Sequence, residues 1–353
     1  MKELVPEISI NGRNISIKNP PYIIAELSAN HNGSINNALD IIKASKDAGA
    51  NAVKLQTYKA DTITLNSRSQ EFMINDGLWS GKSLFELYDE AHLPWEWHHE
   101  IFSFAKEIGI TIFSSPFDFS AVDFLEKLDA PAYKIASFEI VDLKLIEYVA
   151  STGKPMIIST GMANLDEITE AYDTAKSFGC NEIALLHCVS GYPAPHSDYN
   201  LHTISDMKKN FDCVVGLSDH TLSNVTAICS IPLGASLIEK HVTLNRNGGG
   251  PDDSFSLEPN DLKQLCDDSL VAWQSMGSVD YDKKESEQGN AKFRRSLYFV
   301  DDLESGEIIH SHHIKSVRPG YGESPKFFDY FLGKRVKKSV KRNTPVKFNL
   351  LED

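Results

Sequence analysis

The feature that most constrains the fold is a repeated alternation between short apolar runs and longer amphipathic segments. The runs have six or seven residues each and number eight, at residues 22–27, 52–57, 110–116, 132–137, 155–160, 183–188, 214–219 and 237–242. Nearly continuous apolar strands that alternate with helices are typical of a parallel sheet covered by helices. Eight such units in about 250 residues fit a closed (β/α)₈ TIM barrel. An open doubly wound sheet is the alternative, but no G-x-G-x-x-G motif follows the first run.

The segments between the runs carry the spacing and the end signals of helices. Residues 36–50 and 95–109 place apolar side chains at helical intervals, and a glycine near the end of each fits a C-terminal cap. Residues 164–179 open with Asn164, have Glu167 three positions later and close on a glycine. We therefore predict a helix in each of these segments.

Two parts of the chain lie outside the repeat. Residues 8–17 alternate in polarity around an Asn-Gly pair, which predicts a β-hairpin closing the barrel floor. Residues 281–294 are polar and typical of a linker, so we expect a barrel domain over residues 1–280 and a small, mainly β domain over residues 295–353. The connection at residues 58–92 is long for a barrel loop, which favours a lid or a binding wall.

Composition and charge exclude several classes of function. A net charge of −14 argues against nonspecific nucleic-acid binding, and no segment approaches the roughly 20 apolar residues of a transmembrane helix. The first seven residues lack the basic cluster and apolar segment of a signal peptide. The cysteines are odd in number and form no C-x-x-C pair, which predicts reduced core residues of a cytoplasmic protein. They are Cys180, Cys188, Cys213, Cys229 and Cys266.

Polar side chains stand at the carboxyl end of every predicted strand. The seventh run, for example, ends in Ser218 and Asp219, with His220 directly after them. Catalytic groups of TIM barrels lie at this end of the strands. Lys54, Lys134, several hydroxyls and a Thr-Gly turn on one rim suit a phosphorylated ligand, because ammonium groups neutralise phosphate while hydroxyls and backbone N–H groups donate directional hydrogen bonds.

Two histidines follow neighbouring strands of the predicted barrel. His220 and His241 end the seventh and eighth runs, so both imidazoles can reach one divalent metal ion. A zinc site normally has a third protein ligand, which the sequence does not identify, and two histidines with waters or substrate oxygens better fit a six-coordinate, Mn²⁺-like ion. The alternative is a hydrogen-bonded pair of histidines without metal.

At this point the residues resemble a known family. The ordered motifs resemble those of the sialic-acid (nonulosonic acid) synthase family, and they read AELSANHNG, VKLQTY, FSSPFD, YKIASFE, ISTGMA, HCVSGYP, GLSDHT and LIEKHVTL. The segments KFRRSLYF and GEIIHSHHIKSVRPGYG resemble the family's C-terminal SAF (antifreeze-like) domain. The resemblance implies a transferase that condenses phosphoenolpyruvate with an N-acylated amino sugar, giving a nine-carbon nonulosonic acid and phosphate.

The resemblance also implies roles for individual residues. The positions that match the family's phosphoenolpyruvate site are Lys54, Ser115, Lys134, Ser137, Ser159, Ser190 and Ser218, with Ser190 where the sialic-acid branch usually has Asn. His220 and His241 match its metal ligands, which implies Mn²⁺, with Mg²⁺ or Co²⁺ as alternatives. The matching catalytic positions are Glu26, Gln56 and Glu139, and the matching sugar-binding positions are Tyr192, Asp252 and Arg318. In the family this arginine comes from a partner subunit, which implies a domain-swapped homodimer.

Several motifs favour the pseudaminic-acid branch of this family. They include ELSANH, FSSPF, KIASFE and the long loop GLWSGKSLFELYDEAHLPWEWH. The implied substrate is 2,4-diacetamido-2,4,6-trideoxy-L-altrose, whose missing hydroxyl calls for an apolar wall that Leu78, Trp79 and Phe85 would supply. The alternatives are N-acetylneuraminate, legionaminic-acid and spore-coat-type synthases. More remote alternatives are a non-catalytic sugar-phosphate sensor and a metal-dependent aldolase or hydrolase.

Overall fold

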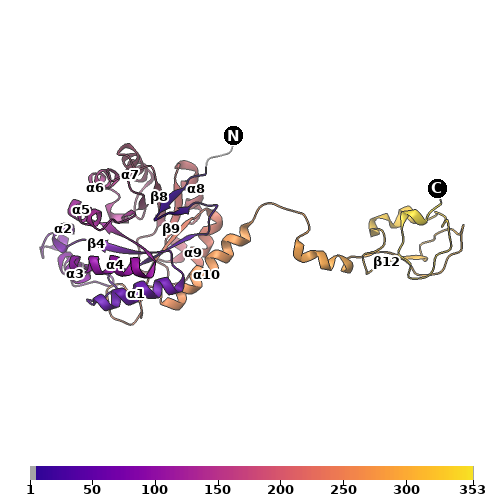
Figure 1. The fold of residues 1–353 in the computed structure, drawn as a ribbon, viewed down its shortest axis with the longest axis horizontal. Coiled ribbons are helices and arrows are strands. Elements are labelled where there is room, and N and C mark those ends of the chain that lie inside the picture. Colours follow the sequence, from indigo (N-terminus) through magenta and orange to yellow (C-terminus); the bar gives the residue numbers. More distant parts are fainter. Residues whose placement is uncertain (1–4, 353) are drawn as a thin grey trace. The chain divides into compact units, whose positions relative to one another are not determined.

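A computed structural model of the chain describes residues 5–352 and divides it into two compact units, Met1–Gly277 and Ser278–Asp353 (Figure 1). Residues 1–4 lie outside the described part, so the structure bears on the expectation about a signal peptide only from Val5 onward. Within the described residues, no helix combines the length and the apolar character needed to cross a membrane.

The first unit is a closed barrel of eight parallel strands, which confirms the predicted fold. Going round the barrel, β10 pairs with β3, and the other strands follow in chain order to β9, which closes on β10. The strands are β3 (Tyr22–Glu26), β4 (Ala52–Thr57), β5 (Thr111–Pro116), β6 (Tyr133–Ile135), β7 (Met156–Ser159), β8 (Ile183–Cys188), β9 (Val214–Ser218) and β10 (Leu237–His241). Strand β6 is shorter than its apolar run because the chain turns into a 3₁₀ helix at Ser137–Glu139.

Helices surround the barrel and follow the end signals in the sequence (Figure 1). Gly49 and Gly109 cap two of them with φ of 98° and 73°, a left-handed conformation that glycine adopts without strain. Asn164 and Glu167 form the expected capping box. The helices are α1 (Ile35–Ala48), α4 (His98–Ile108), α5 (Phe119–Lys127), α6 (Leu143–Ala150), α7 (Leu165–Ser177), α8 (His202–Asn210), α9 (Val225–Ser230) and α10 (Pro259–Met276). The segment predicted from residue 95 starts with a 3₁₀ turn, Trp95–Trp97.

Strand alternation divides the barrel side chains into an outer and an inner set. The outer set, such as Ile23 and Val53, packs against the helices in the main core. The inner set at the amino-terminal end of the strands forms a separate apolar cluster with the hairpin. This hairpin consists of β1 (Ile8–Ile10) and β2 (Arg13–Ile15), which pair in antiparallel fashion, so the predicted floor of the barrel is confirmed.

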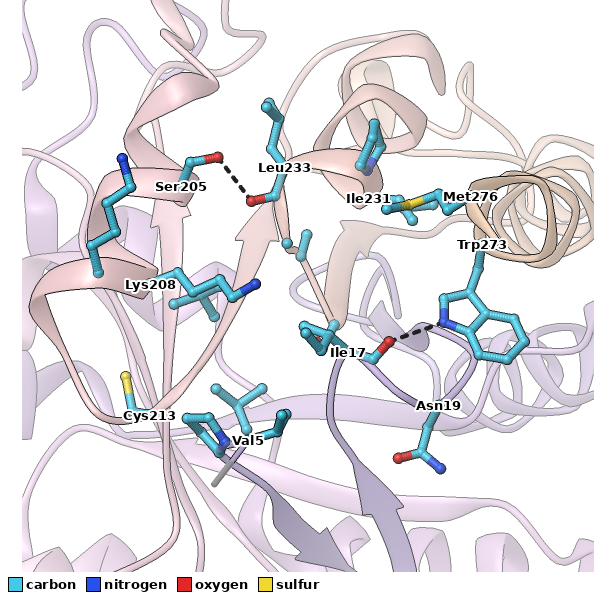
Figure 2. A pocket seen from close by; sticks show the side chains of 18 of the residues that line it. Val5, Ile17, Asn19, Ser205, Lys208, Cys213, Ile231, Leu233, Trp273 and Met276 are labelled. Atoms are coloured by element: carbon cyan, nitrogen blue, oxygen red, sulfur yellow. Dashed lines mark hydrogen bonds between the residues drawn. The ribbon is translucent and has the colours of Figure 1, made fainter. Parts of the chain in front are cut away.

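A groove of about 1210 Å³ lies outside this floor (Figure 2). Its lining comes from the N-terminal segment, the end of α8, the start of β9, the segment just before β10 and the end of α10. Trp273 anchors one side, because its indole N–H donates to the carbonyl of Ile17 at 3.2 Å. The groove is therefore at the opposite end of the strands from the polar rim.

The long connection after β4 is more ordered than a plain loop. It contains the short helix α2 (Ala60–Ile63), a 3₁₀ turn at Gln70–Phe72 and the helix α3 (Leu84–Ala91). Ser83 and Glu86 form a capping box at the start of α3. This insertion follows β4 directly, so it begins at the carboxyl end of the barrel.

The second unit has its own small core. Strand β11 (Ser296–Phe299) pairs in antiparallel fashion with β12 (Ile314–Val317), and isolated bridges tie the later loops together. The helix α11 (Phe328–Phe331) contributes Phe331 to a core with Phe299 and other apolar side chains. The segment expected to be a plain linker includes a 3₁₀ helix at Glu285–Phe293.

The cysteines follow the sequence expectation only in part. All five are free thiols, and Cys180, Cys188 and Cys213 are buried. Cys229, however, is exposed and Cys266 is half-buried, so the expectation that all five are core residues is wrong. Both lie on outer helices, α9 and α10, where one face of each helix is open to solvent.

Candidate active site

In several strands the inner side chains change from apolar to polar or charged within two residues. In β3, Ile24 belongs to the floor cluster and Glu26 is the next inner position. In β10, Leu237 is in the floor cluster, and Glu239 and His241 follow at alternate positions. Because side chains two apart share a face of the sheet, these polar groups all point into the upper part of the barrel.

Four charged groups form a buried ionic cluster in this upper layer. Lys54 Nζ lies 2.8 Å from Glu26 Oε2 and 3.6 Å from Glu239 Oε1, and Lys134 Nζ donates to both oxygens of Glu239 at 3.0 and 3.1 Å. Ser218 Oγ also donates to Glu239 at 3.1 Å. All four charged residues are at least 96% buried. Buried charges persist only when they are paired, so the cluster holds both lysines in fixed positions.

The two carboxylates of the cluster differ in their protonation. Burial would raise the pKa of Glu239, but the adjacent Lys134 and Lys54 outweigh it and lower this pKa to about 2. The pKa of Glu26 is raised, because its burial and the negative charge of Glu239 outweigh the attraction of Lys54. Glu239 is thus the permanent counter-ion of the lysines, and Glu26 is the acid that takes up a proton more readily.

Glu139 is the carboxyl group with the properties of a proton-transfer residue. It closes the 3₁₀ turn after β6, and its Oε2 is buried without a hydrogen-bond partner. Burial raises the pKa of Glu139 to about 7. A carboxyl group with this pKa can accept or donate a proton at neutral pH.

Serine hydroxyls line the same layer. Ser115 Oγ lies 3.4 Å from Lys54 Nζ, and Ser137 Oγ accepts the backbone N–H of Gly161 at 3.2 Å. The hydroxyls of Ser159 and Ser190 are buried and have no partner among the described residues. Buried hydroxyls without partners are costly, which favours a ligand that supplies acceptors here.

The turn after β7 requires a glycine. A Cβ added at Gly161 would collide with Ser190 Oγ and would lie 2.7 Å from Ser137 Oγ. The backbone N–H of this turn is therefore brought close to the hydroxyls, as a cradle for an anion requires.

The two histidines lie together, as the sequence predicts. Their ring centroids are 5.3 Å apart. His220 Nδ1 donates to the carbonyl of Val189 at 2.8 Å, which leaves Nε2 as the free lone pair, and His241 Nδ1 is buried without a partner. Burial lowers the pKa of His241 well below its ordinary value, so the ring is neutral and able to bind a metal.

The imidazole pair fits a metal whose other ligands come from outside the chain. Among residues 5–352, no group of three or more His, Cys, Asp or Glu side chains is arranged to hold a metal ion. The carboxylate of Asp252 is close to this pair, with Oδ2 3.9 Å from His241 Nδ1. Two imidazoles with water or substrate oxygens therefore remain the donor set that the residues support.

Polar and aromatic side chains border the histidines. Gln56 Nε2 donates to Glu26 at 2.9 Å and to Ser28 at 3.1 Å, and Ser28 in turn donates to Asp252. The ring of Tyr192 lies 4.5 Å from that of His220. A binding region with directional groups on one side and aromatic rings on the other is typical of sites for sugars and other amphipathic ligands.

Only part of the expected apolar wall approaches this region. The ring of Trp79 lies 6.0 Å from that of Tyr192. Leu78, its neighbour, is 55% exposed, and Phe85 lies in the first turn of α3. Trp79 is therefore the residue of this group whose ring reaches the aromatic side of the site.

Arg318 is the one predicted site residue that does not belong to the barrel unit. It belongs to the second unit, where its exposed side chain lines a small hollow together with Arg294 and Arg295. The sequence placed Arg318 in the site only through a partner subunit, so its role stays a prediction.

Glu239 bridges the two lysines, although the sequence reading placed it only among the polar strand ends and assigned it no role. The signal was present, because Glu239 precedes His241 by two residues and so shares its inner face. The same parity rule explains why Asp219 has no place in the site. Its carboxylate pairs with Lys240 at 2.9 Å, and Lys240 also donates to the carbonyl of Thr221 at 2.8 Å. This buried pair fixes the turn that carries His220.

Comparisons with known proteins identify the family of this chain. The sequence matches the NeuB family over residues 41–281 and the SAF domain over residues 294–352. A pseudaminic acid synthase from Helicobacter pylori is 42% identical, covering 94% of this chain and 98% of the relative. An N,N'-diacetyllegionaminic acid synthase from Campylobacter jejuni is 37% identical, covering 91% of this chain and 97% of the relative.

A solved structure gives the same result for the fold. The N-acetylneuraminic acid synthetase of Leptospira borgpetersenii superposes with a TM-score of 0.73 at 30% identity, covering 83% of this chain and 98% of that one. The chain is thus a barrel enzyme of the synthase type with an appended SAF domain. It belongs to the NeuB family.

Proposed function

We propose that this enzyme is a pseudaminic acid synthase, a transferase that joins phosphoenolpyruvate to 2,4-diacetamido-2,4,6-trideoxy-L-altrose. One observation carries the proposal: the 42% identity to a pseudaminic acid synthase extends over 94% of the chain. The reaction consumes one water and yields a nonulosonic acid and inorganic phosphate. A bond forms between C3 of phosphoenolpyruvate and the aldehyde carbon of the sugar, and the C–O bond to phosphate breaks.

The buried ionic cluster is the proposed receptor for phosphoenolpyruvate. Lys54 and Lys134 neutralise the phosphate and carboxylate, and Glu239 holds both ammonium groups in place before the ligand arrives. The surrounding hydroxyls donate the directional hydrogen bonds that orient the ligand. They belong to Ser115, Ser137, Ser159, Ser190 and Ser218.

Glu139 is the proposed base of the reaction. The pKa of its carboxyl group is raised to about 7 by burial, and its free Oε2 can accept a proton from the water that attacks C2. Glu26, already bound to Lys54 and Gln56, is placed to stabilise the positive charge that develops at C2. The phosphate then leaves with the bridging oxygen.

His220 and His241 would hold the divalent metal, most simply Mn²⁺, with Mg²⁺ or Co²⁺ as alternatives. When bound, the metal acts as a Lewis acid toward the aldehyde oxygen of the sugar. Tyr192 and Asp252 flank the imidazole pair and are proposed to orient the open-chain sugar beside it.

Product analysis tests the proposed reaction. The purified enzyme is incubated with Mn²⁺, phosphoenolpyruvate and, in separate reactions, the trideoxy L-altrose sugar, the legionaminic-acid precursor or N-acetylmannosamine. We expect phosphate release and pseudaminic acid with the first sugar only, and ¹⁸O from labelled water in the product and none in the phosphate. Turnover of N-acetylmannosamine alone would contradict the proposed sugar substrate, and ¹⁸O label in the phosphate would contradict cleavage of the C–O bond.

A legionaminic acid synthase is the second candidate, because a relative with that activity is 37% identical. The two candidate enzymes differ in the sugar that they condense with phosphoenolpyruvate, so the same product analysis distinguishes them. Both candidates are biosynthetic enzymes that act on a phosphorylated metabolite, and we propose the cytoplasm as the compartment.

We further propose a domain-swapped homodimer, in which the barrel domain of one subunit receives Arg318 from its partner. Exposed apolar side chains in the loops after β6 and β7 support a covered barrel mouth: Phe138, Val141, Met162 and Leu165 are each at least 56% exposed. Arg318 itself is exposed and has no acidic partner within residues 5–352.

Subunit complementation tests the swap. The Arg318→Ala and His241→Ala variants are each expected to be inactive. In a swapped dimer that contains one subunit of each variant, the Arg318→Ala subunit keeps its imidazole pair and receives an intact Arg318 from its partner, so one of the two sites is complete. After random reassociation of equal amounts, about a quarter of the wild-type activity should return. A mixture that stays inactive, although the subunits are shown to exchange, would contradict the swap.

A further inference from the structure

Trp79 sits in a small hairpin within the insertion after β4. We call residues 73–83 the roof hairpin. Its arms meet at an isolated antiparallel bridge between Met73 and Ser83, and the N–H of Gly81 donates back across the hairpin at 2.8 Å. These internal bonds hold the indole in a defined place on a segment that would otherwise be a long loop.

The indole of Trp79 is hydrogen-bonded to the segment that carries Asp252. Its N–H donates to the carbonyl of Pro251 at 3.1 Å, and Asp252 is the next residue. Asp252 is fixed in turn by Ser28, which donates to its carboxylate. The roof hairpin is therefore joined to the sugar side of the site and not to the phosphoenolpyruvate cradle.

An aromatic path leads from the imidazole pair to this indole. The ring of Tyr192 lies 4.5 Å from His220 and 6.0 Å from Trp79. The planes of Tyr192 and Trp79 are tilted by 53°, so the rings are not stacked on each other. A sugar with its aldehyde end at the imidazoles would place its far carbons beside the indole.

We propose that Trp79 is a specificity-determining residue, whose indole packs against the deoxygenated C6 end of the sugar. This inference rests on the proposed function. The indole N–H is already committed to Pro251, so the ring offers a C6 hydroxyl no hydrogen bond, whereas a methyl group loses nothing there. An apolar contact of this size discriminates between substrates by about 10- to 100-fold.

The experiment compares two sugars that differ at C6 only. These are 2,4-diacetamido-2,4,6-trideoxy-L-altrose and its 6-hydroxy analogue, and kcat/KM is measured for each. In Trp79→Ala we expect the preference for the deoxy sugar to fall about 10- to 100-fold, with the KM for phosphoenolpyruvate unchanged. Trp79→Phe, which keeps an aromatic ring but loses the N–H, should retain most of the preference.

Trp273 is the matched control. Its indole also donates to a backbone carbonyl, that of Ile17, but it lies at the groove outside the barrel floor (Figure 2). Trp273→Phe loses the same kind of hydrogen bond and should leave the preference between the two sugars unchanged.

The possible failures are distinguishable. Failure of wild-type enzyme to use either diacetamido sugar would contradict the proposed function before any variant is made. If the wild type is active, two results would overturn the role of Trp79 alone. Either Trp79→Ala keeps the full preference for the deoxy sugar, or it lowers kcat/KM for both sugars by the same factor. Thermal stabilisation by phosphoenolpyruvate shows that the variant is folded, and Trp79→Leu serves as a second variant if alanine unfolds the protein.

Discussion

The two ends of the barrel are built from the same eight strands but have opposite chemistry. At the amino-terminal end, the inner side chains form a dry apolar cluster closed by the β1–β2 hairpin. One or two inner positions further along the strands, the side chains include lysines, carboxylates, hydroxyls and an imidazole. In β4, for example, Ala52 is a floor residue and Lys54 is a residue of the ionic cluster.

This difference shows how a barrel separates stability from chemistry. The floor buries apolar area, which favours folding, whereas the mouth buries four charges that contribute to stability only while they are paired. Substitutions at the floor should therefore change the free energy of unfolding and leave the active fraction normal. Substitutions at the mouth should abolish activity, and they should also lower stability where they leave a buried charge without its partner.

The largest effect is expected at the imidazole pair. His220→Ala or His241→Ala should lower kcat/KM at least about 1000-fold, because each removes one of the two proposed ligands of the Lewis-acid metal. Phosphate release with saturating Mn²⁺ measures this, and a chelator should inactivate the wild type to a similar extent. His312→Ala, at an exposed member of a histidine cluster in the second unit, is the control and should be fully active.

A floor substitution should have its main effect on stability. Phe113 is completely buried in the floor cluster, and Phe113→Ala should lower the free energy of unfolding by about 3–5 kcal/mol through lost contacts and a residual cavity. Urea unfolding measures the loss, and kcat/KM per folded molecule should stay within a few-fold of wild type. A 1000-fold loss of activity in the folded variant would contradict the proposal that the floor contributes to stability and the mouth to catalysis.

Glu139 should give an intermediate effect with a distinct pH signature. If the ionised carboxylate is the base, kcat/KM rises with pH through the pKa of about 7 that burial produces. Glu139→Gln should lower kcat about 100-fold and remove this limb of the profile. A pH profile that is unchanged in the variant would assign the proton transfer to another group, with Glu26 the first to examine.

The smallest net effect on stability is expected from a double substitution in the ionic cluster. Lys134→Met alone leaves Glu239 short of a buried partner and should cost about 3–5 kcal/mol of stability. Adding Glu239→Leu removes that charge, while Lys54 keeps its 2.8 Å contact with Glu26, so stability should return to near the wild-type value. The double variant should remain inactive. Thermal and urea unfolding test the first part, and phosphate release tests the second.

The sequence predicted most of the fold because the signals are local. Each strand is a short apolar run between helices, and helix ends carry their own signals, such as the Asn164–Glu167 capping box. The exposed Cys229 was misjudged because a cysteine in an amphipathic helix can lie on either face, and its class alone does not decide which.

The site was predicted less completely, and the missing parts have a common cause. Glu239 and Lys134 are separated by 105 positions in the chain and come within 3.0 Å only because the barrel closes. Trp79 and Pro251 are 172 positions apart and meet through an insertion with no repeating pattern. Strand periodicity shows which side chains point inward, but it does not show which of them meet.

By itself, then, the sequence determined the barrel, the small second unit and the polar character of the rim, because hydrophobic periodicity and turn residues act over a few neighbouring positions. Only the tertiary structure decided which groups are paired, which carboxyl has a pKa near neutrality and which indole lies beside Tyr192 and Pro251. Those properties depend on burial and on distances of a few ångströms between segments that are remote in the sequence. The burial and the distances are both set when the barrel closes.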